Sequence, residues 1–170
     1  MDVRPGRSGE GAALQDVERA AGLQFHQVGM ASIAEDGPPP LDELEQAIGD
    51  GRIWVAEDAG SAVLGYAHMI LLPDGSAHLE QVSVHPSAQG LGNGRALVDA
   101  VVDRARDTGA RTLTLTTFRD VDWNRPLYEH LGFVVVREDR LSTVLREVRA
   151  HEISCGLDAA GARVAMRLTI

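Results

Sequence analysis

The sequence predicts a single α/β domain in which helices cover a mixed, mostly antiparallel sheet. Three observations support this fold class. Strand-like runs first follow one another with turn signals between them, as in antiparallel hairpins. Strands and helices then alternate, as in strand-helix-strand units with parallel neighbours. Finally, the 170 residues, 44% hydrophobic and 24% charged, suit one domain with one core over residues 1–170.

The first half of the chain is expected to contain four strands and three helices. The strands are expected at residues 2–4, 52–57, 62–72 and 76–85, and the helices at residues 12–21, 24–34 and 41–48. The third helix has Leu41, Leu44 and Ile48 on one face, and Gly49 follows its end. The consecutive prolines at residues 38–40 predict a loop before this helix, because proline lacks a backbone donor.

In the second half, the clearest pattern is the helix expected at residues 92–108. Leu97, Val101 and Ala105 form one apolar stripe on it, and Gly109 follows its end. The other strands are expected at residues 111–117, 133–136 and 163–168, and the other helices at residues 125–131 and 141–154. The C-terminal helix and strand, residues 141–170, are expected either to complete the chain's own core or to form the interface of a homodimer.

The charge of the chain excludes several classes of function. The formal net charge of -9 argues against nucleic acid as a partner, because nucleic-acid-binding proteins usually present a basic face. The absence of lysine excludes a Walker-type phosphate loop and Schiff-base chemistry. Residues 1–50 hold ten acidic side chains and only three arginines. These acids form either a solvated surface or an entrance that attracts a cationic amine.

Several features favour a cytoplasmic protein. The single cysteine, Cys155, cannot form an intrachain disulfide. No apolar run follows the first residues, so no signal peptide is expected. The most apolar stretch, residues 62–72, is far shorter than the roughly 20 residues of a membrane span. The six histidines show no metal-ligand spacing, so we expect no metal.

The most informative segment is the glycine-rich turn at residues 85–95, between a predicted strand and the strongest helix. Glycines let the backbone approach a ligand closely, and the free amides of a helix N-terminus bind anions such as a pyrophosphate. A tight turn that only needs glycine is the alternative. A dinucleotide-binding fingerprint is excluded, because Arg95 and Leu97 stand where it requires glycine.

The pattern formed by Gln89, Gly92 and Gly94 resembles the coenzyme A signature of the GNAT N-acetyltransferase superfamily. Residues 82–86 resemble the strand that leads into this signature. The segment from Asn124 through Tyr128 to residue 133 resembles the family's second signature, and residues 116–124 resemble an uncharacterised bacterial branch.

The resemblance covers residues 57–136 and implies the GNAT fold with acetyl-CoA as cosubstrate. It places the pyrophosphate on the backbone amides that follow Gln89, namely those of Gly90, Gly92, Asn93, Gly94 and Arg95. It also implies that the main chain of Val82 and Val84 pairs with pantetheine, and it assigns Asn124 to the coenzyme site. Asn93 departs from the aliphatic residue that is usual at its position.

The resemblance implies direct attack of an amine on acetyl-CoA, with no acyl-enzyme. Tyr128 matches the position of the general acid; the alternative is a core tyrosine packed on Phe133. On the predicted strand, His78, Glu80, Val82 and Val84 share one face. Glu80 is the expected general base, or else a carboxylate that only binds the amine. His78 is the second candidate for the base, because the ordinary pKa of histidine suits that task.

Three functions remain open. The first is acetyl transfer to a small, cationic amine that enters past residues 21–49, where Glu35, Asp36, Asp42, Glu43 and Glu45 lie. The second is a coenzyme A-binding regulatory domain without catalysis. The third is acetylation of a protein amine. Cys155 as a nucleophile is a weaker alternative mechanism, because no motif surrounds it.

Overall fold

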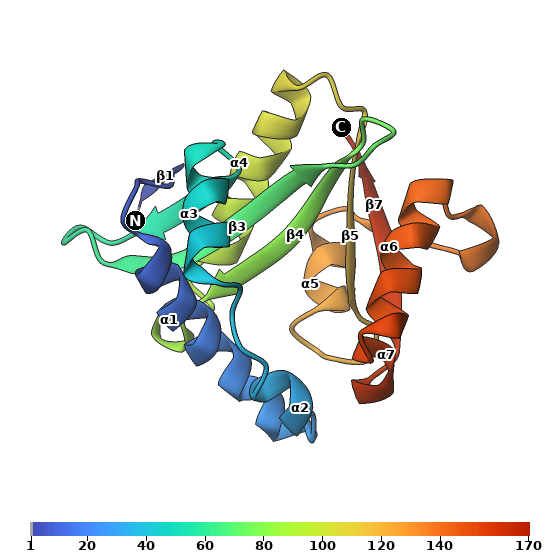
Figure 1. The fold of residues 1–170 in the computed structure, drawn as a ribbon, viewed down its shortest axis with the longest axis horizontal. Coiled ribbons are helices and arrows are strands. Elements are labelled where there is room, and N and C mark those ends of the chain that lie inside the picture. Colours follow the sequence, from blue (N-terminus) through green and yellow to red (C-terminus); the bar gives the residue numbers. More distant parts are fainter. Residues whose placement is uncertain (1) are drawn as a thin grey trace. The chain divides into compact units, whose positions relative to one another are not determined.

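The computed structural model describes residues 2–170, which contain a seven-stranded mixed sheet with strand order β1-β2-β3-β4-β5-β7-β6 (Figure 1). The strands are β1 (Asp2–Pro5), β2 (Ile53–Glu57), β3 (Val63–Leu71), β4 (Ala77–Val84), β5 (Thr112–Phe118), β6 (Val134–Val136) and β7 (Arg163–Thr169). The helices are α1 (Gly11–Gly22), α2 (Ala31–Ala34), α3 (Leu41–Gly49), α4 (Asn93–Asp107), α5 (Arg125–His130), α6 (Thr143–Ser154) and α7 (Leu157–Ala160). The predicted α/β class with a mixed sheet flanked by helices is confirmed.

The chain divides into two compact units. The first unit comprises residues 2–70 and 79–104, and the second comprises residues 71–78 and 105–170. Strand β4 and helix α4 therefore each contribute residues to both units. The single domain expected over residues 1–170 stays a prediction.

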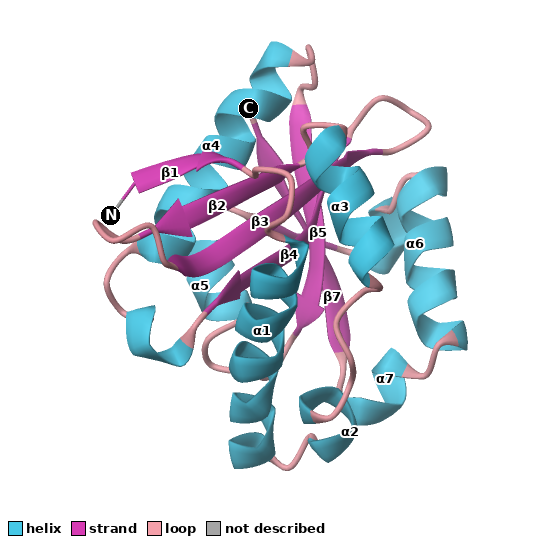
Figure 2. Ribbon diagram, turned by 60° about the vertical axis from the view of Figure 1, so that its left-hand side comes forward, coloured by secondary structure: helices cyan, strands magenta, loops and turns pink. Residues whose placement is uncertain are grey.

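Helices α1 and α3 cover one face of the sheet in the first unit (Figure 2). The strands β1, β2 and β3 are antiparallel there, with Val3 opposite Ala56 and Val55 opposite Tyr66. The core between helices and sheet consists of Leu14, Val17, Leu44, Ala47, Ile48, Ile53, Val55 and Tyr66. Alternate positions of the strands supply this apolar face, because successive side chains of a strand point to opposite faces.

Polar contacts fix α3 and the preceding loop against α1. The carboxylate of Glu45 on α3 accepts hydrogen bonds from the backbone N–H groups of Gly9 at 2.9 Å and Gly11 at 2.7 Å. Negative charge at this position suits the free N–H groups at the start of α1. Nε2 of Gln15 donates to the carbonyl oxygen of Pro39 at 2.8 Å, which holds the proline loop along α1.

Helix α4 packs on the opposite face of the first unit. Leu97 and Val101 of the predicted stripe are buried here, and so is Val98 beside them. Gly65 of β3 allows β4 and α4 to lie close to β3. An added Cβ would lie 2.8 Å from the carbonyl oxygen of Ser83 and 3.3 Å from Cδ1 of Leu97. A side chain at position 65 would therefore push β4 away from β3.

In the second unit, β4 is parallel to β5 at the pair Ala77 and Leu113, while β7 is antiparallel to both β5 and β6. Glu152 of α6 is buried against these strands, where it accepts hydrogen bonds from Thr116 and Arg163. The C-terminal strand thus completes the chain's own sheet, and the homodimer stays a prediction.

The helix expected at residues 24–34 is wrong. The chain instead forms a 3-10 helix at Leu23–Val28, reverses at Gly29 with φ of 73°, and then forms the short helix α2. The left-handed conformation of Gly29 ends a helix, and glycine adopts it readily. Helix α7 was not anticipated. Within residues 2–170, no helix is both long and apolar enough to cross a membrane.

Candidate active site

The turn before α4 contains two glycines in a backbone conformation that other residues rarely adopt. Gly90 has φ of 73° and Gly92 has φ of 86°, which lie in the left-handed region that favours glycine. An added Cβ at either position would meet nothing within 4 Å, so the space beside the turn is open. The glycines are therefore required by the backbone path and leave room for a ligand.

Helix α4 begins at Asn93, directly after this turn, and the amide of Ala96 donates to the carbonyl oxygen of Gly92 at 3.0 Å. The N–H groups of the first turn, including those of Gly94 and Arg95, precede any carbonyl to which they could donate within the helix. Free N–H groups of this kind, together with the helix dipole, favour the binding of an anion. The guanidinium of Arg95 adds a positive charge, 3.6 Å from Asp99.

Two side chains of the turn hold it in shape. Nε2 of Gln89 donates to the carbonyl oxygen of Val84 at 3.1 Å and thereby connects the turn to the end of β4. Asn93 is buried, and its Nδ2 donates to the carbonyl oxygen of Ala88 at 2.7 Å. The polar side chain at position 93 therefore stabilises the turn, while its backbone amide belongs to the helix start.

Strand β4 carries the other residues expected to contact the coenzyme. Val82 and Val84 are half-buried, and the amide of His85 donates to the carbonyl oxygen of Leu64 at 2.8 Å. Glu80 is exposed. The first unit thus brings together the turn, Val82, Val84 and Glu80 on one continuous strand and loop.

His78 lies at the other end of this strand, in the second unit, and is buried with 2% exposure. Burial lowers its pKa to about 4, so the assumption of an ordinary pKa does not hold. Its Nδ1 lies 2.8 Å from Oγ1 of Thr114, and that hydroxyl lies 3.2 Å from the carbonyl oxygen of Ala77. If the hydroxyl donates to the carbonyl, Nδ1 carries the hydrogen and donates to Thr114. The environment keeps the ring neutral.

Tyr128 belongs to α5 in the second unit. Its ring contacts that of Phe133 in an edge-to-face arrangement with centroids 5.8 Å apart, so the expected packing contact is present. Burial raises the pKa of Tyr128 to about 12, which keeps the hydroxyl protonated at neutral pH. Asn124 lies one turn earlier, where its carbonyl oxygen accepts from the amide of Tyr128 at 3.3 Å.

The family model for acetyltransferases of the GNAT family matches residues 19–133. The chain belongs to the GNAT acetyltransferase family. Mycothiol acetyltransferase of Beutenbergia cavernae is 31% identical over 127 residues, which cover 71% of this chain and 43% of that protein. Aminoglycoside N(6')-acetyltransferase type 1 of Stenotrophomonas maltophilia is 38% identical over 88 residues, which cover 46% of this chain and 58% of that protein. The chain therefore spans less than two thirds of the length of either relative.

Solved structures of the family share the fold. Rv2747 from Mycobacterium tuberculosis, in complex with CoA and NLQ, has a TM-score of 0.73 at 19% identity, covering 100% of this chain and 99% of that chain. The PaiA N-acetyltransferase of Thermoplasma acidophilum, in complex with coenzyme A, has a TM-score of 0.71 at 15% identity, covering 99% and 98%. At these identities the similarity shows the fold alone.

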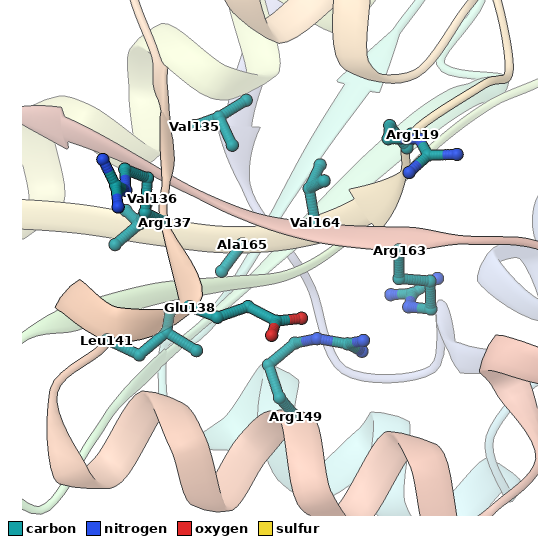
Figure 3. A pocket seen from close by; sticks show the side chains of 10 residues that line it. All are labelled: Arg119, Val135, Val136, Arg137, Glu138, Leu141, Arg149, Arg163, Val164 and Ala165. Atoms are coloured by element: carbon teal, nitrogen blue, oxygen red, sulfur yellow. The ribbon is translucent and has the colours of Figure 1, made fainter.

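An open pocket in the second unit is lined by four arginines, Arg119, Arg137, Arg149 and Arg163 (Figure 3). Each has a carboxylate partner, at 2.8 Å from Asp120, 3.0 Å from Asp139, 2.5 Å from Asp158 and 3.0 Å from Glu152, respectively. These carboxylates neutralise the positive charge, so the pocket lacks the excess charge of an anion site.

The sequence interpretation missed Glu18, which contacts Tyr66 and Gln81. These residues are far apart in the chain, and none belongs to a family signature. The only signal in the sequence was the acidic composition of the first 50 residues.

Proposed function

We propose that the protein transfers the acetyl group of acetyl-CoA to a primary amine of a small, cationic acceptor by direct attack in a ternary complex. The observation that carries this proposal is the start of α4, where two left-handed glycines precede free N–H groups that would suit an anion, in a chain of the acetyltransferase family. The pyrophosphate of the coenzyme is the anion that this site suits.

The coenzyme would be held mainly by backbone atoms. Amides from Gly90 to Arg95 would bind the pyrophosphate, with Asn124 as a further contact that the family resemblance implies. The main chain of Val82 and Val84 would pair with pantetheine in the manner of an added strand. Gln89 supports this geometry because it connects the turn to Val84.

The reaction forms a C–N bond and breaks the C–S bond of the thioester. The acceptor enters as an ammonium ion, loses one proton before it attacks, and loses a second as the amide forms. One proton goes to the departing thiolate of coenzyme A, and the other is released. Tyr128 would supply the proton to the thiolate, since its raised pKa keeps it protonated.

Glu80 would take the proton from the amine, directly or through a water, because it is an exposed carboxylate on the coenzyme strand. His78 is less suited to this task, because burial disfavours the protonated form that a base must reach. Two observations support a cationic acceptor. The first 50 residues are acidic, and one relative is named an aminoglycoside N(6')-acetyltransferase.

Gly94→Val tests the coenzyme site. A Cβ at position 94 would meet only Cγ2 of Val84, at 3.8 Å, so the fold should tolerate the change while the larger side chain obstructs the pyrophosphate. Gly92→Val is less informative because φ of 86° strains any side chain there. Calorimetry should show that Gly94→Val loses acetyl-CoA binding, whereas the control Gly49→Val, also in open helical space, retains it. Unchanged affinity in a folded Gly94→Val protein would place the coenzyme elsewhere.

Catalysis itself is tested by thiol release from acetyl-CoA in the presence of a panel of primary amines. Turnover with small amines is the expected result. A protein that binds acetyl-CoA but acetylates neither small amines nor peptide amines would instead be a coenzyme A-binding domain without catalysis. Acetylation of peptides alone would identify a protein acetyltransferase.

A further inference from the structure

Three side chains from different elements meet on the face of the first unit that α1 covers. The carboxylate of Glu18 on α1 accepts a hydrogen bond from the hydroxyl of Tyr66 on β3 and another, at 3.3 Å, from Nε2 of Gln81 on β4. Nε2 of Gln81 also donates to Oγ of Ser83 at 2.9 Å. Tyr66 of β3 thus donates to Oε2 of Glu18, and Gln81 of β4 donates to Oε1.

Glu18 forms no ion pair with any side chain of residues 2–170, and the neighbouring Arg19 is paired with Asp16 at 2.9 Å. Burial raises the pKa of Glu18, the hydrogen bond from Tyr66 opposes this, and the negative charge of Asp36 raises the pKa further. A positively charged group beside Glu18 and Asp36 would be stabilised by both carboxylates.

Packing alone does not account for a carboxylate at this position. The Tyr66 hydroxyl is fully buried and needs an acceptor, but a neutral carbonyl oxygen would satisfy it without the desolvation of a charge. Glu18 is half-buried, so its side chain is not fully enclosed in the core. The carboxylate is thus oriented by the protein at a partly exposed position.

The Glu18 cluster adjoins the strand proposed to bind pantetheine. Gln81 lies between Glu80 and Val82, and successive side chains of a strand point to opposite faces. Gln81 points to the face of α1. Val84 points to the face of α4, where its Cγ2 would lie 3.2 Å from a Cβ added at Gly65. A ligand bound at Glu18 would therefore lie on the face of β4 opposite α4, and its other amine would pass beside the strand to reach Glu80 on the face of Val84.

We propose that Glu18, held by Tyr66 and Gln81 and reinforced by Asp36, binds an ammonium group of the acceptor other than the amine that reacts. The reacting nitrogen must lose its proton, and a carboxylate beside it would favour the protonated form. A second ammonium group keeps its charge throughout the reaction. The acceptor is therefore a compound with at least two amino groups. This inference rests on the proposed function for the reaction at the first amine.

Three five-carbon amines test the assignment, namely 1,5-diaminopentane, 1-aminopentane and 5-aminopentanoate. They differ only in the group at the far end, which is cationic, apolar or anionic. The native protein should show the highest kcat/KM for 1,5-diaminopentane. Glu18→Gln should reduce its preference for this diamine over 1-aminopentane by roughly tenfold or more, as expected for loss of a hydrogen bond to a charged group. This ratio does not depend on the fraction of active protein.

Asp16→Asn is the matched control, because it removes the same charge from an exposed position of the same helix. It should leave the preference unchanged. Asp36→Asn, at an exposed loop residue, should reduce the preference less than Glu18→Gln, and it keeps the test available if Glu18→Gln does not fold.

Calorimetry of 1,5-diaminopentane binding to the coenzyme A complex separates this inference from the proposed function. Weaker binding by Glu18→Gln, in a protein that releases no thiol with any amine, would support the Glu18 site and refute the transferase activity. Equal diamine binding and equal preference in the native protein and Glu18→Gln would overturn the inference while leaving the activity intact. An equal loss of kcat for all three amines in Glu18→Gln would also overturn the inference, because Glu18 would then act in proton transfer and not in binding the second ammonium group. Failure of the native protein to bind the diamine would overturn it as well.

Discussion

Protonation of His78 opposes folding, which predicts a loss of stability as the pH falls below 6.5. The imidazole is 2% exposed, and burial lowers its pKa from 6.5 to about 4. The unfolded chain takes up a proton near the ordinary pKa, whereas the folded chain excludes it until about pH 4. The contribution of His78 to stability is therefore complete above pH 6.5 and decreases as the pH falls toward 4.

The magnitude follows from the two pKa values. One pKa unit corresponds to about 1.4 kcal/mol, so His78 alone should lower the free energy of unfolding by about 2 kcal/mol between pH 7 and pH 5. His78→Asn removes the titrating ring and keeps an amide near the Nδ1 position beside Thr114. This variant should be less stable at pH 7, but its stability should change less between pH 7 and pH 5.

Urea unfolding followed by circular dichroism at pH 7, 6 and 5 measures these differences. The exposed His130 provides a control, since His130→Asn should keep the pH dependence of the native protein. His68, whose pKa is also lowered to about 4, acts in the same direction and leaves a residual dependence in His78→Asn. If the change in stability between pH 7 and pH 5 is the same with and without His78, the buried ring does not resist protonation and the reasoning fails.

Two further substitutions test the coenzyme strand and the proposed acid. Tyr128→Phe should keep acetyl-CoA affinity and the contact with Phe133 but lower kcat at least tenfold, within the roughly 10²–10⁴-fold range of general acid catalysis; equal steady-state turnover would leave Tyr128 a packing residue. Gly65→Ala should destabilise the protein by about 1–3 kcal/mol and weaken acetyl-CoA binding in calorimetry, because its Cβ would lie 2.8 Å from the carbonyl oxygen of Ser83. Gly49→Ala, in open space, should do neither, and a Gly65→Ala protein with native stability would show that β4 shifts freely.

Local patterns were sufficient to predict most of the fold. Residues 41–48, 92–108 and 111–117 were predicted within one or two residues, because an apolar stripe or β-branched run marks each and a glycine lies at or just after the end of both helices. The segment after α1 was not predicted correctly, because a helical composition does not reveal the left-handed Gly29. Helix α7 was missed because it is short and lies between two glycines.

The turn that is proposed to bind the coenzyme could be located from the sequence because its residues are adjacent in the chain, and its glycines include Gly90 and Gly92, whose φ is positive. The burial of individual residues along one face of β4 could not be predicted. His78 and Glu80 are two positions apart and were expected on the same face, yet His78 is buried and Glu80 is exposed. The contact of Glu18 with Tyr66 joins residues 48 positions apart and depends on how α1 packs on the sheet, which no local pattern records.

The contacts that hold α3 and the proline loop to α1 concern the proposed acceptor side of the protein and not the proposed coenzyme site. Glu45 and Gln15 fix these elements through backbone groups of Gly9, Gly11 and Pro39. These hydrogen bonds position the loop that carries Asp36, and none of them reaches β4 or the turn before α4. In the proposed arrangement, substitutions there would alter which amines are accepted and leave the proposed coenzyme site intact. A lineage would then diversify its acceptors through this helical layer and keep one coenzyme site throughout.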